Sequence, residues 1–95
     1  MAVSSRNRTI LRDLARRVAE IGHDPQQEIN RNLWRQHNSL ESLRPLVLVF
    51  PEGSWCELLP REKVLECDDP SLHEWEWLLR HFIYRWEHLR DDNVI

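Results

Sequence analysis

The sequence is poor in glycine, in cysteine and in long apolar runs. Gly22 and Gly53 are its only glycines, so no glycine-rich loop can cradle a phosphate. Its two cysteines, Cys56 and Cys67, form no Cys-x-x-Cys pair, which argues against a disulfide framework and a zinc ribbon. No apolar run exceeds five residues and the first residues turn polar at once, so neither a membrane span nor a signal peptide is indicated. We therefore expect a cytoplasmic protein.

Positive charge is not in excess either. Thirteen Lys and Arg residues stand against sixteen Asp and Glu residues, which gives a formal net charge of -3. A phosphate backbone would meet no surplus of positive field, so we expect no nucleic-acid partner. A length of 95 residues predicts a single domain, and a hydrophobic share of 41% is typical of a folded chain rather than a disordered tail.

Residues 1–38 predict two short helices. Apolar residues recur at helical spacing up to Ile21, and Gly22 suits a left-handed stop. The dipeptide Asp24-Pro25 then combines an N-cap with a residue suited to the first helical position, and Gln27 completes the pattern of a capping box. We expect the two helices to form a hairpin or corner.

Residues 39–68 predict a segment that contains strands. The run from Leu46 to Phe50 is apolar without interruption, which is typical of a strand covered on both faces. Residues 63–67 form a weaker strand candidate, because their alternation is poor. Two adjacent strands are marginal in water, so this ribbon needs helices over its faces or further strands beside it.

Residues 69–91 predict a long amphipathic helix that is rich in tryptophan. Asp69 and Pro70 repeat the cap-then-proline signal. The apolar residues follow at alternating steps of three and four, as in a packing seam, and we interpret them as core or interface. They are Leu72, Trp75, Leu79, Phe82, Trp86 and Leu89. Two surface ion pairs are expected, Glu76 with Arg80 and Glu87 with Arg90.

The expected fold class is α+β and mainly helical, with three helices and one or two short strands. The Leu46 strand lacks neighbours within these 95 residues. The chain also ends on Val94 and Ile95, two β-branched residues, as though another strand were about to start. These features favour missing strands outside the sequence, and therefore a larger parent protein.

Aromatic side chains of the long helix permit two interpretations. Trp75, Trp77 and Trp86 could form a platform for a planar ligand. Aromatic stripes at helical spacing are more often buried, so we favour Trp75 and Trp86 as core or interface. Trp77 and Tyr84 are seven residues apart and would share a second contact face.

Metal binding and catalysis find little support. His73 and Glu76 have the i, i+3 spacing of some metal-ligand pairs, but no second pair is present, and His81 and His88 are expected to face solvent. Cys56 is a lone thiol beside Trp55, which favours an inert cysteine. We predict no catalytic, cofactor-binding or metal-binding residues, and no catalysis by residues 1–95 alone.

Three passages, RNLWRQHNSL, RPLVLVFPEGSWCELLP and LECDDPSLHEWEWLLRHFIYRWEHL, carry a resemblance. Over residues 6–95 the chain resembles the N-terminal region of a bacterial group within the uroporphyrinogen decarboxylase-like superfamily, which also holds cobalamin-dependent (corrinoid) methyltransferases. The resemblance implies a parent with a (β/α)8 barrel. The zinc ligands of the methyltransferase members lie downstream of the matched region, so zinc and a corrinoid are implied for the parent and not for this chain.

These observations leave three hypotheses. The first is a non-catalytic N-terminal segment that packs on the remainder of such a barrel protein, whose parent is a corrinoid-dependent methyltransferase or a decarboxylase-like enzyme. The alternative is a stand-alone interaction module that forms a homo-oligomer through the six seam residues of the long helix. The third is a small metal or ligand binder that uses His73 and Glu76.

Overall fold

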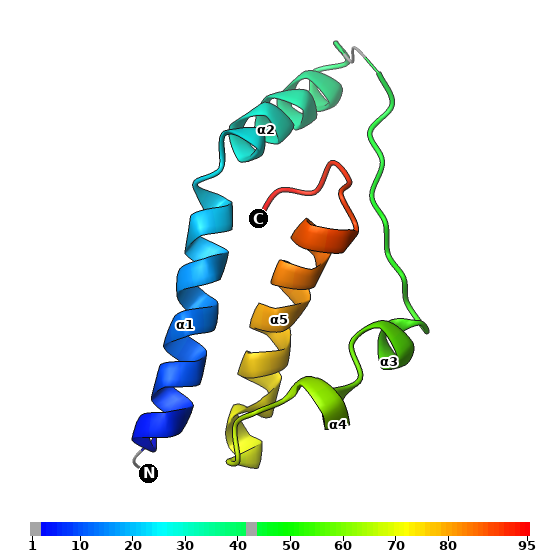
Figure 1. Cartoon of the computed structure of the whole chain (residues 1–95). Coiled ribbons are helices and arrows are strands. Elements are labelled where there is room, and N and C mark those ends of the chain that lie inside the picture. The colour runs from blue at the N-terminus through cyan, green and yellow to red at the C-terminus, as the bar shows by residue number, and fades with distance from the viewer. Residues whose placement is uncertain (1–2, 42–43) are drawn as a thin grey trace.

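The computed structural model describes residues 3–41 and 44–95. Figure 1 shows α1 alongside α5, α2 beyond a bend in the chain, and an extended segment that descends on the other side of α5 to two one-turn helices. The elements are α1 (Ser5–Gly22), α2 (Pro25–Asn38), α3 (Trp55–Leu58), α4 (Arg61–Val64), the 3-10 turn η1 (Pro70–Leu72) and α5 (His73–His88).

The predicted α+β class is wrong, because the described residues contain helices and no strand. Residues 46–50 are extended but pair with no other strand. Val47 is 56% exposed and Phe50 is 62% exposed, so the segment is not covered on both faces. The weaker strand candidate at residues 63–67 is also wrong, since its first part belongs to α4. Side chains, rather than a neighbouring strand, bond to one edge of the extended backbone.

The two predicted N-terminal helices are present, and they meet at a corner (Figure 1). The Asp24 side chain accepts from the backbone N–H of Gln26, which confirms the predicted cap. Gly22 does not adopt the predicted left-handed stop: α1 ends because Asp24 must be extended ahead of Pro25. The predicted capping box is wrong as well, because the buried Gln27 accepts from the backbone N–H of Ile95 instead.

Helix α5 keeps only part of its predicted seam buried. Trp86 is 8% exposed, as expected of a core residue, whereas Trp75 is 64% exposed and takes no part in the chain's own core. Trp75 is exposed because α1 packs against a different side of α5. Arg17 of α1 binds Glu87 at 3.1 Å, and Leu14 of α1 lines a hollow of about 180 Å3 together with Ile83. The seam therefore turns partly away from α1.

The two predicted surface ion pairs of α5 have different outcomes. Glu87 binds Arg17 rather than Arg90, whose guanidinium lies 3.6 Å from the centre of the Trp86 ring. Glu76 does bind Arg80, with 2.7 Å between carboxylate and Nε, but this pair is not on the surface. The Glu76 side chain is fully buried.

Glu76 fixes the chain that leads into α5. Its carboxylate accepts from the backbone N–H groups of Glu66 and Cys67, each at 2.8 Å, besides the bond from Arg80. Burial raises the pKa of Glu76, but these donors outweigh it, so the pKa lies below its ordinary value. The ionised carboxylate thus ties residues 66 and 67 to the first turn of the helix.

The apolar core is small. Among the described residues the buried apolar side chains are Ile21, Leu59, Cys67 and Trp86, and six polar or charged side chains are buried with them. The radius of gyration is 16.0 Å, whereas a compact domain of this length has about 12 Å. Buried hydrogen bonds therefore carry an unusually large share of the contacts between segments.

We predict that Glu76→Gln lowers the free energy of unfolding by roughly 2 kcal/mol or more, because an amide cannot accept from all three donors and leaves buried groups unpaired. Glu74→Gln is the matched control, since Glu74 lies on the same helix and pairs with Arg61 at the surface. Urea unfolding followed by circular dichroism measures both variants. Equal midpoints for the two variants would contradict the role given to Glu76.

Candidate interaction surface

Two aspartates directly after α5 hold the extended segment in place. The N–H of Val47 donates to Asp92 at 2.7 Å, and the N–H of Val49 donates to Asp91 at 2.8 Å. In return, the N–H of Asp92 donates to the carbonyl of Val47 at 2.9 Å. The bonded residues alternate along the segment, as they do in a strand. One backbone edge of residues 46–50 is therefore satisfied without a sheet.

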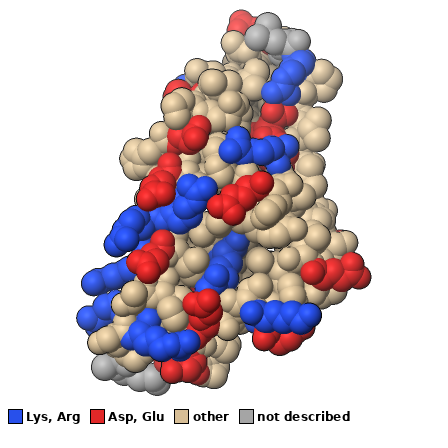
Figure 2. Space-filling view, in the orientation of Figure 1, with Lys and Arg blue, Asp and Glu red and all other residues tan. Residues whose placement is uncertain are grey.

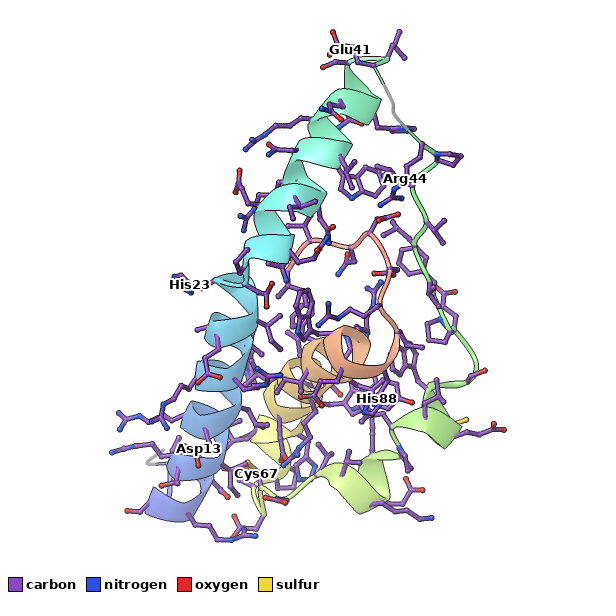
Figure 3. The ribbon with its side chains drawn as sticks, turned by 45° about the horizontal axis from the view of Figure 1, so that its top comes forward. Asp13, His23, Glu41, Arg44, Cys67 and His88 are labelled. Carbon is purple, nitrogen blue, oxygen red and sulfur yellow. The ribbon has the colours of Figure 1, made fainter. Side chains whose placement is uncertain are left out.

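Two arginines neutralise these carboxylates. We call residues 91–95 the C-terminal turn. Arg44 reaches toward this turn (Figure 3), where its guanidinium binds both carboxylate oxygens of Asp92 at 2.7 and 2.9 Å. Arg85 of α5 donates to Asp91 at 2.8 Å and to the carbonyl of Val49 at 3.2 Å. The Arg44 bond, against the opposing effect of burial, lowers the pKa of Asp92 to about 2. Asp92 is thus ionised at neutral pH.

Helix α2 holds the C-terminal residues from the other side. The indole N–H of Trp34 donates to the carbonyl of Asp92 at 2.7 Å, and the Asn30 amide donates to the carbonyl of Asn93 at 3.1 Å. Gln27 accepts from the N–H of Ile95 at 2.9 Å. The C-terminal segment therefore joins three parts of the chain: α2, α5 and the extended segment.

The opposite backbone edge of the extended segment is open. The N–H groups of Leu46, Leu48 and Phe50 have no partner among the described residues. The Cζ atom of Arg85 lies 5.4 Å from the centre of the Phe50 ring. The Phe50 side chain is otherwise exposed. Figure 2 shows charges of both signs interspersed over the face in view, with an uncharged stretch along its right-hand margin, where Figure 1 places this segment.

One face of α5 is open as well. Trp75, Leu78 and Phe82 lie on the same side of the helix because they are three and four residues apart. Trp75 and Leu78 are exposed, and Phe82 is partly exposed. We call these three residues the α5 face. It differs both from the side that contacts α1 and from the side that contacts α3.

Trp55 of α3 covers the side of α5 that carries Trp77 and Tyr84, which the sequence predicted to be a second contact face. Trp77 and Tyr84 share a side of α5, and each ring centre lies 5.9 Å from that of Trp55. His81 stacks on Trp77 at 5.1 Å, so the prediction of a solvent-facing His81 is wrong. Burial lowers the pKa of His81, with a smaller effect from Arg85. These aromatic rings pack on one another, and Trp55 and Trp77 also line a hollow of about 180 Å3.

The residues considered for metal binding are engaged elsewhere. The Nε2 atom of His73 lies 2.7 Å from the carbonyl oxygen of Cys67, and the Glu76 carboxylate is occupied by its three donors. Over residues 3–41 and 44–95, no three side chains of the metal-ligating types converge. The hypothesis of a site built on His73 and Glu76 has no geometric support.

Neither cysteine is set up as a nucleophile. Cys67 is buried beside Glu76, and burial together with the hydrogen bond to that carboxylate raises the pKa of its thiol to about 11. The thiol therefore stays protonated at neutral pH, although His73 lies near it. Cys56 is exposed on α3, and its sulfur lies 3.7 Å from the carbonyl oxygen of Gly53.

Comparison with protein-family models, curated proteins and solved structures found no match for this chain. None of the described helices combines the length and the apolar character that crossing a membrane requires.

Sequence reasoning missed the aspartates that build this surface. Sequence pattern alone gives Asp91 and Asp92 no role beyond the end of the long helix. A signal was present in the charges: two adjacent carboxylates follow the helix, and Arg44 lies two positions before the apolar run. Nothing local linked the two places, which are 48 positions apart in the chain.

We predict that acid loosens this anchor. Because the pKa of Asp92 is lowered on folding, its contribution to stability is present above pH 3.8 and is lost as the pH falls toward 2. Asp92→Asn should lower the free energy of unfolding at pH 7 by roughly 2 kcal/mol and flatten its pH dependence below pH 4. Urea unfolding between pH 2 and pH 7 tests this, with Asp13→Asn on the exposed side of α1 as the control. Parallel pH curves for wild type and Asp92→Asn would contradict it.

Proposed function

We propose that this chain is a non-catalytic packing module that buries the α5 face against a larger partner protein. The observation that carries the proposal is the exposed indole of Trp75, on a helix whose other sides are packed against α1 and α3. Tryptophan is the residue most enriched at the energetic centres of protein interfaces. Leu78 and Phe82 extend the same contact along the helix.

The accessible surface of the chain supports a partner. It measures 6624 Å2, whereas a folded monomer of 11.5 kDa has about 5,800 Å2. The difference is close to the area of about 800 Å2 that one protein contributes to a standard interface. The small apolar core agrees with this, because a module that completes its core on a partner needs less of its own.

The partner that we propose is the remainder of a uroporphyrinogen decarboxylase-like protein of the bacterial cytoplasm. Support comes from the three passages that resemble the N-terminal region of that group. Corrinoid-dependent methyl transfer, with zinc, or a decarboxylase-like reaction would then belong to the parent. The described His73, Glu76 and Cys67 are engaged within this chain, so it would contribute structure and no reacting group.

A pair of tryptophan variants tests whether the α5 face is free for a partner. We predict that Trp75→Asp changes the free energy of unfolding by less than about 0.5 kcal/mol and reduces binding of the apolar dye ANS, because the side chain is exposed. Trp86→Asp is the matched variant on the same helix and should cost more than about 4 kcal/mol, since it buries an unpaired charge. Unfolding by Trp75→Asp would show that this residue serves the chain's own core.

The intact mass of the protein purified from its native cells tests the proposed parent. We expect it to exceed 11.5 kDa by at least one further domain of about 100–150 residues, covalently continuous with this sequence. A native mass of 11.5 kDa would overturn the parent. If that small protein also formed a dimer that Trp75→Asp dissociates, the alternative of a stand-alone module dimerising through α5 would replace it.

A further inference from the structure

We propose that the open edge of residues 46–50 pairs antiparallel with the same segment of a second copy of this chain, forming a two-fold symmetric dimer. This inference goes beyond the packing function, because it uses the backbone of the extended segment and not the α5 face.

The direction of each backbone group follows from the bonds already made. The N–H and carbonyl of Val47 and of Val49 point toward the C-terminal turn and Arg85. In an extended chain the next residues point the opposite way. Leu46, Leu48 and Phe50 therefore present their N–H and carbonyl groups outward. The carbonyl of Phe50 already accepts from Glu52 at 2.8 Å, and its second lone pair remains for a partner.

The two prolines fit this edge. Pro45 and Pro51 are separated from Val47 and Val49 by an even number of positions. In an extended chain, the N–H that each proline lacks would therefore have pointed to the inner side, where Asp91 and Asp92 lie. All the residues required for outward pairing keep a donor. The prolines thus bound the edge to a length of five residues without interrupting it.

Symmetric pairing about Leu48 makes the segment complementary to itself. Leu48 lies opposite Leu48 of the second copy, and Leu46 lies opposite Phe50, and each of these pairs exchanges two backbone hydrogen bonds.

These features favour a second copy over an unrelated peptide. No charge lies between Arg44 and Glu52, so the segment lacks the residues that usually keep edge strands apart. A two-residue shift in register would remove one of the three outward hydrogen-bonded pairs. Only the symmetric register uses the whole edge.

Sedimentation equilibrium of the 95-residue chain tests the proposal. We expect a dimer for the wild type, and monomers for Leu48→Lys and for Leu48→Glu, whose dissociation constants should rise more than about tenfold because like charges meet at the two-fold axis. An equimolar mixture of the two variants should form a heterodimer, since Lys then faces Glu. Circular dichroism at each step shows whether the variants remain helical.

Two controls separate this proposal from the packing function. Leu48→Ala keeps the backbone donor and should leave a weaker dimer, whereas Leu48→Pro removes the donor and should abolish it. Trp75→Asp should leave the dimer intact. A monomeric wild type up to about 1 mM, a Lys and Glu mixture that stays monomeric, or a dimer that Trp75→Asp dissociates and Leu48→Pro does not, would each overturn edge pairing. An unrelated extended peptide bound by a monomeric wild type would do the same.

Discussion

Buried carboxylates accept from backbone N–H groups of two irregular segments that lie against α5. Glu76 in the first turn of α5 accepts from residues 66 and 67, and Asp91 and Asp92 after its last turn accept from residues 47 and 49. A buried N–H without a partner is costly, and a chain without strands cannot satisfy it through a ladder. The described part of this protein uses acidic side chains where other small domains use a sheet. The positions of the extended segment and of the chain that leads into α5 follow from these bonds.

This use of α5 also explains which of its sides stays open. The helix has an acidic and basic side, with Glu76, Arg80 and Glu87, that faces α1 and the chain before the helix. Its Trp77 side is covered by Trp55. The apolar α5 face is left over, although apolar burial usually decides how a helix packs. Packing by polar contacts inside the chain leaves apolar side chains of α5 exposed.

Local sequence patterns predicted the helices well. The sequence did not show which distant segments contact one another. Ser4, Asp24 and Asp69 each cap a helix or turn through a side-chain bond to a residue two or three positions on, and such bonds are visible in a short stretch of sequence. The apolar run at residues 46–50 predicts an extended chain but cannot show what satisfies it. The seam of α5 predicts an apolar side but not which neighbour covers it. Trp77 and Tyr84 do share a side, as the spacing indicates, yet only the fold shows that α3 fills it. The resemblance to uroporphyrinogen decarboxylase-like proteins stays a prediction.

The C-terminal turn closes the chain into a non-covalent ring, and this has a kinetic consequence. Its bonds to α2 join residues 58 to 68 positions apart, and its bonds to the extended segment span 42 to 48 positions. The helices can form within a microsecond from local contacts, but closing loops of this length carries an entropy cost before any bond repays it. Ring closure is therefore the late step of folding. Its rate should depend on how early Arg44 meets Asp92, because attraction between opposite charges acts over a longer range than any other contact at that junction.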